Sequence, residues 1–397
     1  MSSEVPSRFI GLDVHKHYLV AIGVNADLEK VVGPHRISLT SLEDWVAKHL
    51  TPNDAVVIEM STNAYELYDT LFPHVHSVTL VHPPHVVLIT RAQVKTDRKA
   101  AETLAQLHAA GLLPGIWVPP VEIRELRSLI SYRRRMVSLS TQAKNRLHSV
   151  LHRNRILPPE GEAFTDDKLD WWLGLPLTSI ERFRVQSNLD TLAFAQSQLA
   201  QILENLTDIG AQDDRVPILI QLPGFGLVIA MTILGAIGDI TRFPTAKHLV
   251  GYAGLGARVH DSGLTHKTGG ITKAGRRDLR GAMIQAARVA AQHDPKWRAE
   301  MERLRKRMIY QKTVVAIARK LLVVVWHVLT KVEADRHADP KRVATKLMLH
   351  AYCLKEQRRP NGQTAPEYVR HQMNRLDIPL QSFRMNGRKI VLQPADR

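Results

Sequence analysis

The chain has 397 residues, which is enough for two or three domains and a sizeable core. Its 54 Lys and Arg against 38 Asp and Glu give a formal charge of +16, which predicts a polyanionic partner, most simply nucleic acid. The single cysteine, Cys353, excludes an internal disulfide and a cysteine-based zinc site, and favours a reducing cytosol. The most apolar run, Val314 to Leu329, is interrupted by Arg319, Lys320 and His327, so we expect a buried helix and no membrane span.

Residues 1 to about 115 are expected to form a mixed α/β segment. Residues 9–24 predict a β-hairpin, because two apolar runs rich in β-branched residues are joined tightly. Further strands are predicted at 55–60 and 77–81. The pair Thr96-Asp97 is expected to cap a helix, since a threonine there can accept hydrogen bonds from the first helical turn.

Three acids, Asp13, Glu59 and Asp97, stand at the ends of these predicted elements. An acid in an otherwise buried strand is costly unless it is paired or holds a metal ion. Carboxylates at strand ends and on an adjoining helix can converge on Mg²⁺, and two such ions clamp the attacking and leaving oxygens in phosphodiester chemistry. Each acid also has a plain structural interpretation, as a turn residue, an edge charge and a helix cap. The joint pattern in a basic protein favours the metal site.

Residues 116–215 are expected to hold two long amphipathic helices, at 121–155 and at about 189–206, which suggest a coiled-coil hairpin or a dimer contact. The first helix has nine Lys and Arg but only two Glu, so we interpret it as a surface for phosphate contacts rather than a solvated face. The residues predicted to bind nucleic acid there are Arg124, Arg127, Arg133, Arg134, Arg135, Lys144 and Arg146.

Residues 216–330 are expected to be mostly helical around a Gly-rich run, 253–276, with Ser262 in a loop between two helices. Serine is a weak nucleophile that needs activation, and nearby cations suit a phosphodiester because they stabilise charge on its oxygens. Ser262 is therefore a candidate nucleophile, although Ser-Gly pairs in loops are common. The cations around it that are predicted to bind nucleic acid are Arg258, Lys267, Lys273, Arg276 and Arg277.

Residues 331–397 form a C-terminal extension whose sequence indicates no function. Asn386-Gly387 between two short apolar runs predicts a β-hairpin, because both residues tolerate the positive φ of a tight turn.

Two sets of motifs, in the expected order, resemble the DEDD transposases of insertion-sequence family 110. The set similar to the N-terminal domain of the family comprises residues 10–14, Ile58-Glu59 and 95–102. The set similar to the C-terminal transposase domain comprises residues 223–226, Phe243, 251–255, Ser262-Gly263, 271–275 and Leu279-Arg280. The resemblance implies an α/β RuvC-like (RNase H-like) N-terminal domain, a helical coiled-coil middle and a mostly α C-terminal transposase domain.

The resemblance also implies a site-specific DNA recombinase of the bacterial cytoplasm, associated with the nucleoid and guided by a structured non-coding bridge RNA. Such a protein would act on donor and target DNA as a homo-oligomer, a dimer or tetramer. Asp13, Glu59 and Asp97 would bind Mg²⁺, with Mn²⁺ as an alternative, beside the scissile phosphate. Ser262 would attack that phosphate and form a covalent protein–DNA intermediate, in a composite site that joins the two domains between protomers.

The chain departs from the family pattern at Ala100, where the family has a second Asp three residues after Asp97. Positions 97 and 100 share a helix face, so two carboxylates there could face one metal pair, whereas Glu102 lies roughly 140° around the helix from Asp97. We therefore hypothesise a crippled metal site, in a natural inactive copy or a deliberately inactivated protein. Two other functions stay open, a metal-dependent junction nuclease that activates water and a non-catalytic nucleic-acid-binding protein.

Overall fold

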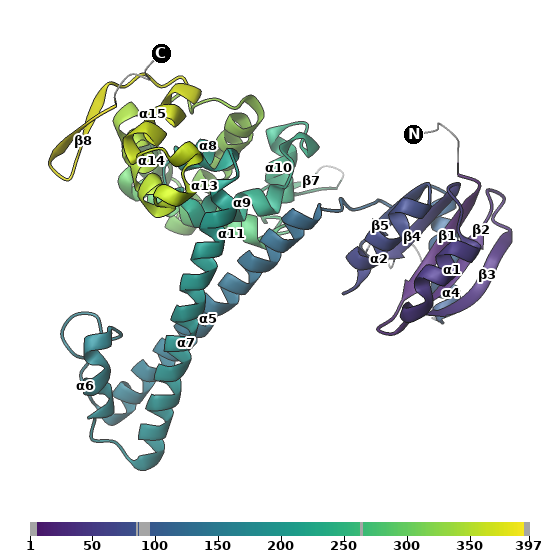
Figure 1. Cartoon of the computed structure of the whole chain (residues 1–397), viewed down its shortest axis with the longest axis horizontal. Coiled ribbons are helices and arrows are strands. Elements are labelled where there is room, and N and C mark those ends of the chain that lie inside the picture. Colours follow the sequence, from purple (N-terminus) through teal and green to yellow (C-terminus); the bar gives the residue numbers. More distant parts are fainter. Residues whose placement is uncertain (1–5, 85, 87–95, 263–264, 393–397) are drawn as a thin grey trace. The chain divides into compact units, whose positions relative to one another are not determined.

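The computed structural model describes residues 6–84, 86, 96–262 and 265–392, and leaves the side chains of 260–261 and 265–268 outside that description. The chain divides into two compact units, Met1–Pro120 and Val121–Arg397, whose elements are labelled in Figure 1. Each unit has its own hydrophobic core. The finer division of the chain at residues 115, 215 and 330 stays a prediction.

The N-terminal unit is built on one five-stranded sheet in the order β3-β2-β1-β4-β5. Its strands are β1 (Arg8–Val14), β2 (Tyr18–Val24), β3 (Lys30–Ser38), β4 (Asp54–Glu59) and β5 (Ser77–Val81). Strand β2 is antiparallel to β1 and β3, whereas β4 is parallel to β1 and to β5. This mixed sheet confirms the predicted hairpin, the two later strands and the α/β character of the segment.

Helices pack on both faces of this sheet, because its central strands are apolar on each side. One face holds a core that includes Ile10, Leu12, Val56 and Ile58, together with residues of α1 (Leu42–His49) and α2 (Ala64–Leu71). The alternate side chains of the same strands face α4 (Asp97–Ala109), as the contacts of Val57 with Leu104 and of Val20 with Ala101 show. Thr96 caps α4 as predicted, since its Oγ1 accepts a hydrogen bond from the backbone N–H of Lys99 at 3.3 Å.

Gly11, in the middle of β1, allows α4 to approach the sheet at backbone contact distance. A Cβ atom at position 11 would lie 2.1 Å from the carbonyl oxygen of Ala101 and 2.6 Å from the backbone nitrogen of Ala105. Both neighbours are helix backbone atoms that cannot rotate away, so any side chain there would push the helix off the strand.

We expect Gly11→Ala to destabilise the N-terminal unit by about 1–3 kcal/mol, the usual cost of overpacking a core. Hydrogen–deuterium exchange of peptides from β1 and α4 measures the loss directly, because it reports on this unit alone. Gly115→Ala is the matched control, since its Cβ would meet only the Thr79 methyl group, at 3.1 Å. Equal exchange rates in the two variants would contradict the steric argument.

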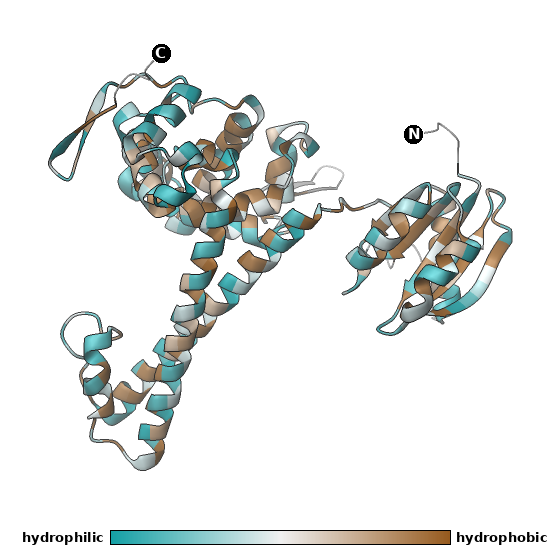
Figure 2. Ribbon diagram, in the orientation of Figure 1, coloured by the Kyte–Doolittle hydropathy of each residue, from teal (hydrophilic) through white to brown (hydrophobic). Residues whose placement is uncertain are grey.

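The C-terminal unit begins with two long antiparallel helices, α5 (Val121–Asn154) and α7 (Ser179–Ala211). Tyr132 donates a hydrogen bond to Gln198 Oε1 at 3.0 Å, and Arg153 donates one to Glu181 Oε2 at 3.2 Å, so the two helices run in opposite directions. Figure 2 shows hydrophobic and hydrophilic residues alternating along both helices. The hairpin is confirmed, whereas coiled-coil packing between the helices stays a prediction.

Helix α7 starts ten residues earlier than the apolar pattern predicts. Thr178 accepts a hydrogen bond from the backbone N–H of Glu181, and this cap starts the helix within a polar stretch. Beside α7 lies the short helix α6 (Leu169–Leu173), where Trp172 is buried with Leu147, Val185 and Leu192. The burial of Trp172 and the hydrogen bond from its Nε1 to the Ala163 carbonyl hold this helical turn.

The remainder of this unit is mostly helical, with one large core that extends from Leu126 to Leu392. Its helices are α8 (Arg215–Ile220), α9 (Leu227–Ile237), α10 (Ala246–Tyr252), α11 (Arg277–His293), α12 (Pro295–Arg305), α13 (Tyr310–Lys331), α14 (Pro340–Leu354) and α15 (Ala365–Arg375). Its strands are β6 (Ala257–Ser262), β7 (Thr265–Ile271), β8 (Ser382–Met385) and β9 (Arg388–Val391). The tail after residue 330 therefore packs into the same core as the residues before it.

Helix α13 and the last hairpin confirm two of the predictions made for this region. By length and composition α13 could cross a membrane, but Ile317, Leu321 and Val325 are fully buried in the protein core. Strands β8 and β9 are joined by Asn386 and Gly387, whose φ values of 49° and 76° are those of the predicted tight turn.

Candidate functional site

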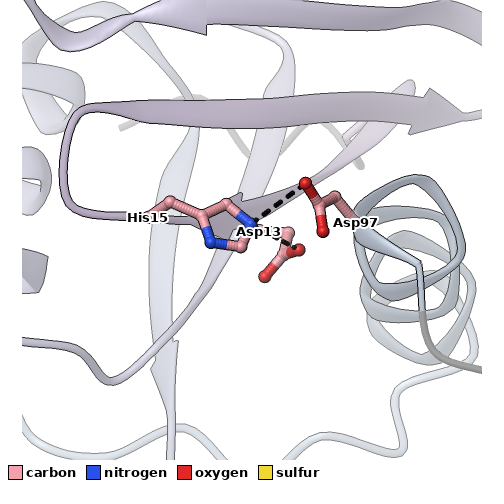
Figure 3. Close-up of side chains that lie close together, drawn as sticks. All are labelled: Asp13, His15 and Asp97. Atoms are coloured by element: carbon pink, nitrogen blue, oxygen red, sulfur yellow. Dashed lines mark ion pairs between the residues drawn. The ribbon is translucent and has the colours of Figure 1, made fainter.

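Three side chains meet where β1 ends and α4 begins, namely Asp13, His15 and Asp97 (Figure 3). One donor atom of each lies within 4.8 Å of the other two. His15 Nε2 is 3.3 Å from Asp13 Oδ2 and 3.4 Å from Asp97 Oδ2. All three residues are half-buried, and the Nε2 atom of His15 is itself buried.

The local chain path explains why these residues meet. Asp13 and His15 are two positions apart, and residues at that spacing along an extended chain point to the same face. The backbone N–H of His15 donates to the carbonyl of Tyr18 at 2.9 Å, which fixes the turn between β1 and β2. Asp97 is the first residue of α4, where the helix dipole favours a negative charge.

Tyr18 contacts two of these three side chains, Asp97 and His15. Its hydroxyl donates a hydrogen bond to Asp97 Oδ2 at 3.0 Å, and its ring stacks on that of His15 with centroids 4.5 Å apart. The guanidinium carbon of Arg36 lies 3.9 Å from the centroid of the same ring. The hydrogen bond to Asp97 raises the pKa of Tyr18, so the phenol remains a donor. Tyr18 therefore orients both Asp97 and His15.

Glu59, the other predicted acid, ends β4 beside the end of β1. The pairing of Leu12 with Ile58 places Asp13 and Glu59 at the next register position and on the same face of the sheet. Among the described residues, however, the group of donor atoms within 4.8 Å contains Asp13, His15 and Asp97 but not Glu59.

Ala100 lies in the first turn of α4, one turn after Asp97, so the two positions share a face as the sequence predicts. Glu102 pairs with Lys30, with its Oε1 2.9 Å from Lys30 Nζ. Glu102, the next acid after Asp97 along the helix, is thus engaged in another ion pair. This agrees with the prediction that it is a poor substitute for an acid at position 100.

His15 is the residue of this site that sequence reasoning missed. The signal was its spacing of two residues from Asp13 at a strand end, but the expectation of all-oxygen ligands left it out. Two carboxylates and an imidazole are a donor set that divalent cations accept in proteins. Beside the group, a cavity of about 510 Å³ is lined in part by Arg36, Asp97 and Arg98, which gives it a basic rim suited to phosphate.

Ser262 lies in a β-hairpin rather than in a loop, and the prediction of a loop was wrong. It is the last residue of β6 and pairs with Thr265 of β7. Its side chain is exposed. The two strands are mostly polar, and β7 contains two glycines, so they lack the apolar alternation that predicts strands, and cross-strand hydrogen bonds form them instead.

The base of this hairpin is fixed to the helices on either side. Gly254 and Gly275 have φ values of 65° and 94°. A Cβ atom on either would lie 2.1–2.2 Å from a carbonyl oxygen of the opposing segment. The backbone N–H of Arg276 donates to the Tyr252 carbonyl at 2.8 Å, and Arg280 Nη1 donates to the Ala253 carbonyl at 2.9 Å. The exposed serine is therefore presented by an anchored support.

The cations predicted around Ser262 fall into two groups. Arg258, Lys273 and Arg277 are exposed and can meet a phosphate. Arg276 forms an ion pair with Asp278, with its Nε 3.0 Å from Asp278 Oδ1. The side chain of Lys267 lies outside the described residues.

The predicted cations of α5 also divide by environment. Arg134, Arg135 and Arg146 are exposed, and Lys144 Nζ lies 5.0 Å from the centroid of the Phe164 ring. Arg127 donates to the carbonyls of Gly235 and Ala236, at 2.7 and 3.0 Å, near the C-terminal end of α9. Arg124 and Arg133 are half-buried, and burial lowers the pKa of Arg133. The exposed three are the ones placed to meet a phosphate backbone.

Comparison with known proteins identifies the family. A model described as "Transposase", of the DEDD type of IS110, matches residues 10–155. A model described as "Transposase IS116/IS110/IS902 family" matches residues 216–302. The chain belongs to the IS110 family of transposases. An IS110 transposase is a DNA transposase or recombinase, so DNA is its substrate, and its DEDD domain suggests a divalent metal ion.

Two relatives of this IS110 transposase match most of its length, and a third matches a shorter part. The "Pilin gene-inverting protein" of Moraxella bovis is 26% identical over 333 residues, which cover 81% of this chain and 95% of the relative. The "Transposase for insertion sequence element IS1111A" of Coxiella burnetii is 24% identical over 336 residues, which cover 83% and 91%. An uncharacterized 43.6 kDa protein of insertion element IS110 from Streptomyces coelicolor is 33% identical over 114 residues, 28% of each chain.

We expect Tyr18→Phe to weaken binding of Mn²⁺ to the transposase by about 10-fold, the lower end of the effect of losing a hydrogen bond to a metal ligand. The substitution removes the bond to Asp97 but keeps the ring that stacks on His15. Titration of Mn²⁺ followed by the electron paramagnetic resonance of the free ion measures the change. Tyr68→Phe, on α2, is the matched control, and an equal loss in both variants would show that Tyr18 does not orient the site.

Proposed function

We propose that this IS110 transposase is a site-specific recombinase, guided by a structured bridge RNA, in which Ser262 forms a covalent bond to DNA. The exposed position of Ser262, on a hairpin whose base is anchored, carries this proposal. A nucleophile must reach a phosphorus atom in a polymer substrate and yet be held in a defined geometry. An exposed serine on a hairpin with an anchored base meets both needs.

In the proposed reaction, Ser262 Oγ attacks a backbone phosphorus of the DNA. The serine hydroxyl gives up its proton as the Oγ–P bond forms, one P–O bond to deoxyribose breaks, and the leaving oxygen takes up a proton to become a free hydroxyl end. A hydroxyl end from a second DNA strand then attacks the same phosphorus and releases the serine, so no phosphodiester is lost. The exposed cations Arg258, Lys273 and Arg277 would stabilise the negative charge that develops on the phosphate oxygens.

Asp13, Glu59 and Asp97 would hold a divalent cation, Mg²⁺ or Mn²⁺, near the scissile phosphate. When bound, the cation supplies positive charge that polarises the phosphate. These acids and Ser262 belong to different units of the chain. We propose that the composite site is completed between protomers of a homo-oligomer, on donor and target DNA.

The exposed arginines of α5 support the proposed RNA contact. Arg134, Arg135 and Arg146 lie on one long helix and are exposed, so they can follow a phosphate backbone. Backbone contacts of this kind leave sequence recognition to base pairing with the guide RNA. We propose that the complex acts in the bacterial cytoplasm, at the nucleoid.

We expect a covalent protein–DNA adduct that depends on Ser262. The full-length protein, the non-coding RNA of its element, Mg²⁺ and labelled DNA are mixed, denatured and separated by gel electrophoresis. Ala100→Asp, which restores the fourth acid, should increase the adduct, and Ser262→Ala in that background should reduce it to background, because the attacking oxygen is gone.

Ser382→Ala in the same Ala100→Asp background is the matched control, since Ser382 begins β8 in the same unit. Cleaved DNA without adduct, and without dependence on Ser262, would indicate a nuclease that activates water. No cleavage by any variant would leave a nucleic-acid-binding protein.

We expect Arg134→Ala with Arg135→Ala to weaken RNA binding at moderate salt and to lower the slope of log K against log salt by about 1.5, as two lost phosphate contacts would. Filter binding at several salt concentrations measures the slope. Arg388→Ala with Lys389→Ala, which removes the same charge from exposed positions of β9, is the control. An equal effect of both pairs would mean that net charge alone governs RNA binding.

A further inference from the structure

We propose that His15 is a direct ligand of the divalent cation and supplies the donor that Ala100 lacks. The site would then bind the cation through a nitrogen in addition to carboxylate oxygens. It would favour cations that accept imidazole, such as Mn²⁺ and Co²⁺, more strongly than an all-carboxylate site does. The inference rests on the proposed metal site, and it deepens that proposal by assigning a ligand and a metal preference.

The placement of the His15 ring is the first support. The ring directs its Nε2 toward both carboxylates, at 3.3 Å from Asp13 Oδ2 and 3.4 Å from Asp97 Oδ2 (Figure 3). Two donors about 2.1 Å from one ion lie about 3.0 Å apart at a right angle and about 3.4 Å apart at a tetrahedral angle. The observed separations are thus those of neighbouring ligands around one cation.

The bonding state of His15 Nε2 is the second support. The side chain is 34% exposed, yet the Nε2 atom itself is buried, and although it lies within ion-pair distance of both carboxylates it has no hydrogen-bond partner in the described part of the chain. A histidine placed only to neutralise two carboxylates would donate a well-aligned hydrogen bond to one of them. An Nε2 that approaches both carboxylates without such a bond is placed instead as an acceptor for a cation.

The surroundings hold the ring in this orientation. Tyr18 stacks on the ring and binds Asp97 through its hydroxyl, so one residue supports two of the three donors. Arg36 covers the ring of Tyr18, with its guanidinium carbon 3.9 Å from the centroid. A hydrogen bond from an outer residue to a ligating carboxylate, such as the one from Tyr18 to Asp97, is typical of metal sites.

The donor type predicts the metal preference. Mg²⁺ takes oxygen ligands and keeps several waters, whereas imidazole suits transition metals. Affinity for sites with nitrogen donors also rises from Mn²⁺ to Co²⁺. Loss of the His15 nitrogen should therefore reduce the affinity for Mn²⁺ and Co²⁺ more than the affinity for Mg²⁺.

Pulsed electron paramagnetic resonance of Mn²⁺ bound to the full-length protein tests the assignment, because it detects a nitrogen nucleus bonded to the ion. We expect a nitrogen coupling in the unaltered protein and in His17→Ala, where an exposed histidine two residues away is removed as a control. His15→Ala and His15→Gln should lose the coupling and bind Mn²⁺ at least about 10-fold more weakly. Adding Ala100→Asp to His15→Ala should recover affinity without the coupling and shift the preference toward Mg²⁺.

The Mn²⁺ measurements distinguish a wrong role for His15 from a wrong metal site. If Mn²⁺ binding depends on Asp13 and Asp97, tested as Asp13→Asn and Asp97→Asn, but shows no nitrogen coupling and is unaffected in both His15 variants, the role of His15 is overturned and the metal site stands. If Mn²⁺ binding is unaffected by both Asn variants, the proposed metal site itself is wrong.

Discussion

The close packing of α4 on β1 at Gly11 is the constraint on which the N-terminal site depends. Since the helix backbone touches the strand backbone there, the first turn of α4 comes level with the end of β1, and Asp97 reaches Asp13 and His15. A longer residue at position 11 would lift the helix and separate the donors. The distances between the charged groups therefore depend on Gly11, a residue without a side chain that is not itself part of the candidate site.

The serine hairpin is held by the same kind of contact. Gly254 and Gly275 bring the two chain segments at its base together, and each has a positive φ as well as a carbonyl oxygen where a Cβ atom would be. In both places glycine allows backbone to meet backbone, and the candidate functional side chains lie on the elements that this contact positions. A side chain carried by helices or strands is placed more precisely than one carried by a loop.

Much of the fold could be predicted from local patterns, because β1, β2, β4 and β5 are apolar runs and α4 has a clear cap. Strand β3 could not, since in the edge strand Lys30–Ser38 only Val32 and Ile37 are buried. The β6–β7 hairpin was missed for a related reason, because pairing rather than burial forms its strands. His15 was missed because its role depends on α4, more than 80 residues away, which a local pattern does not reveal.

Composition predicted the class of partner correctly, but it could not say which cations are available to that partner. Arg127 binds the carbonyl groups near the end of α9, Arg276 pairs with Asp278, and Arg280 holds the base of the hairpin, so each is engaged within the protein. A guanidinium that already donates to a carbonyl or carboxylate has fewer N–H donors left for a phosphate. The positive charge that remains available on α5 and around Ser262 is carried by exposed residues such as Arg134, Arg135 and Arg258. A charge excess thus identifies a polyanion as the partner, and only the tertiary contacts show where the polyanion can bind.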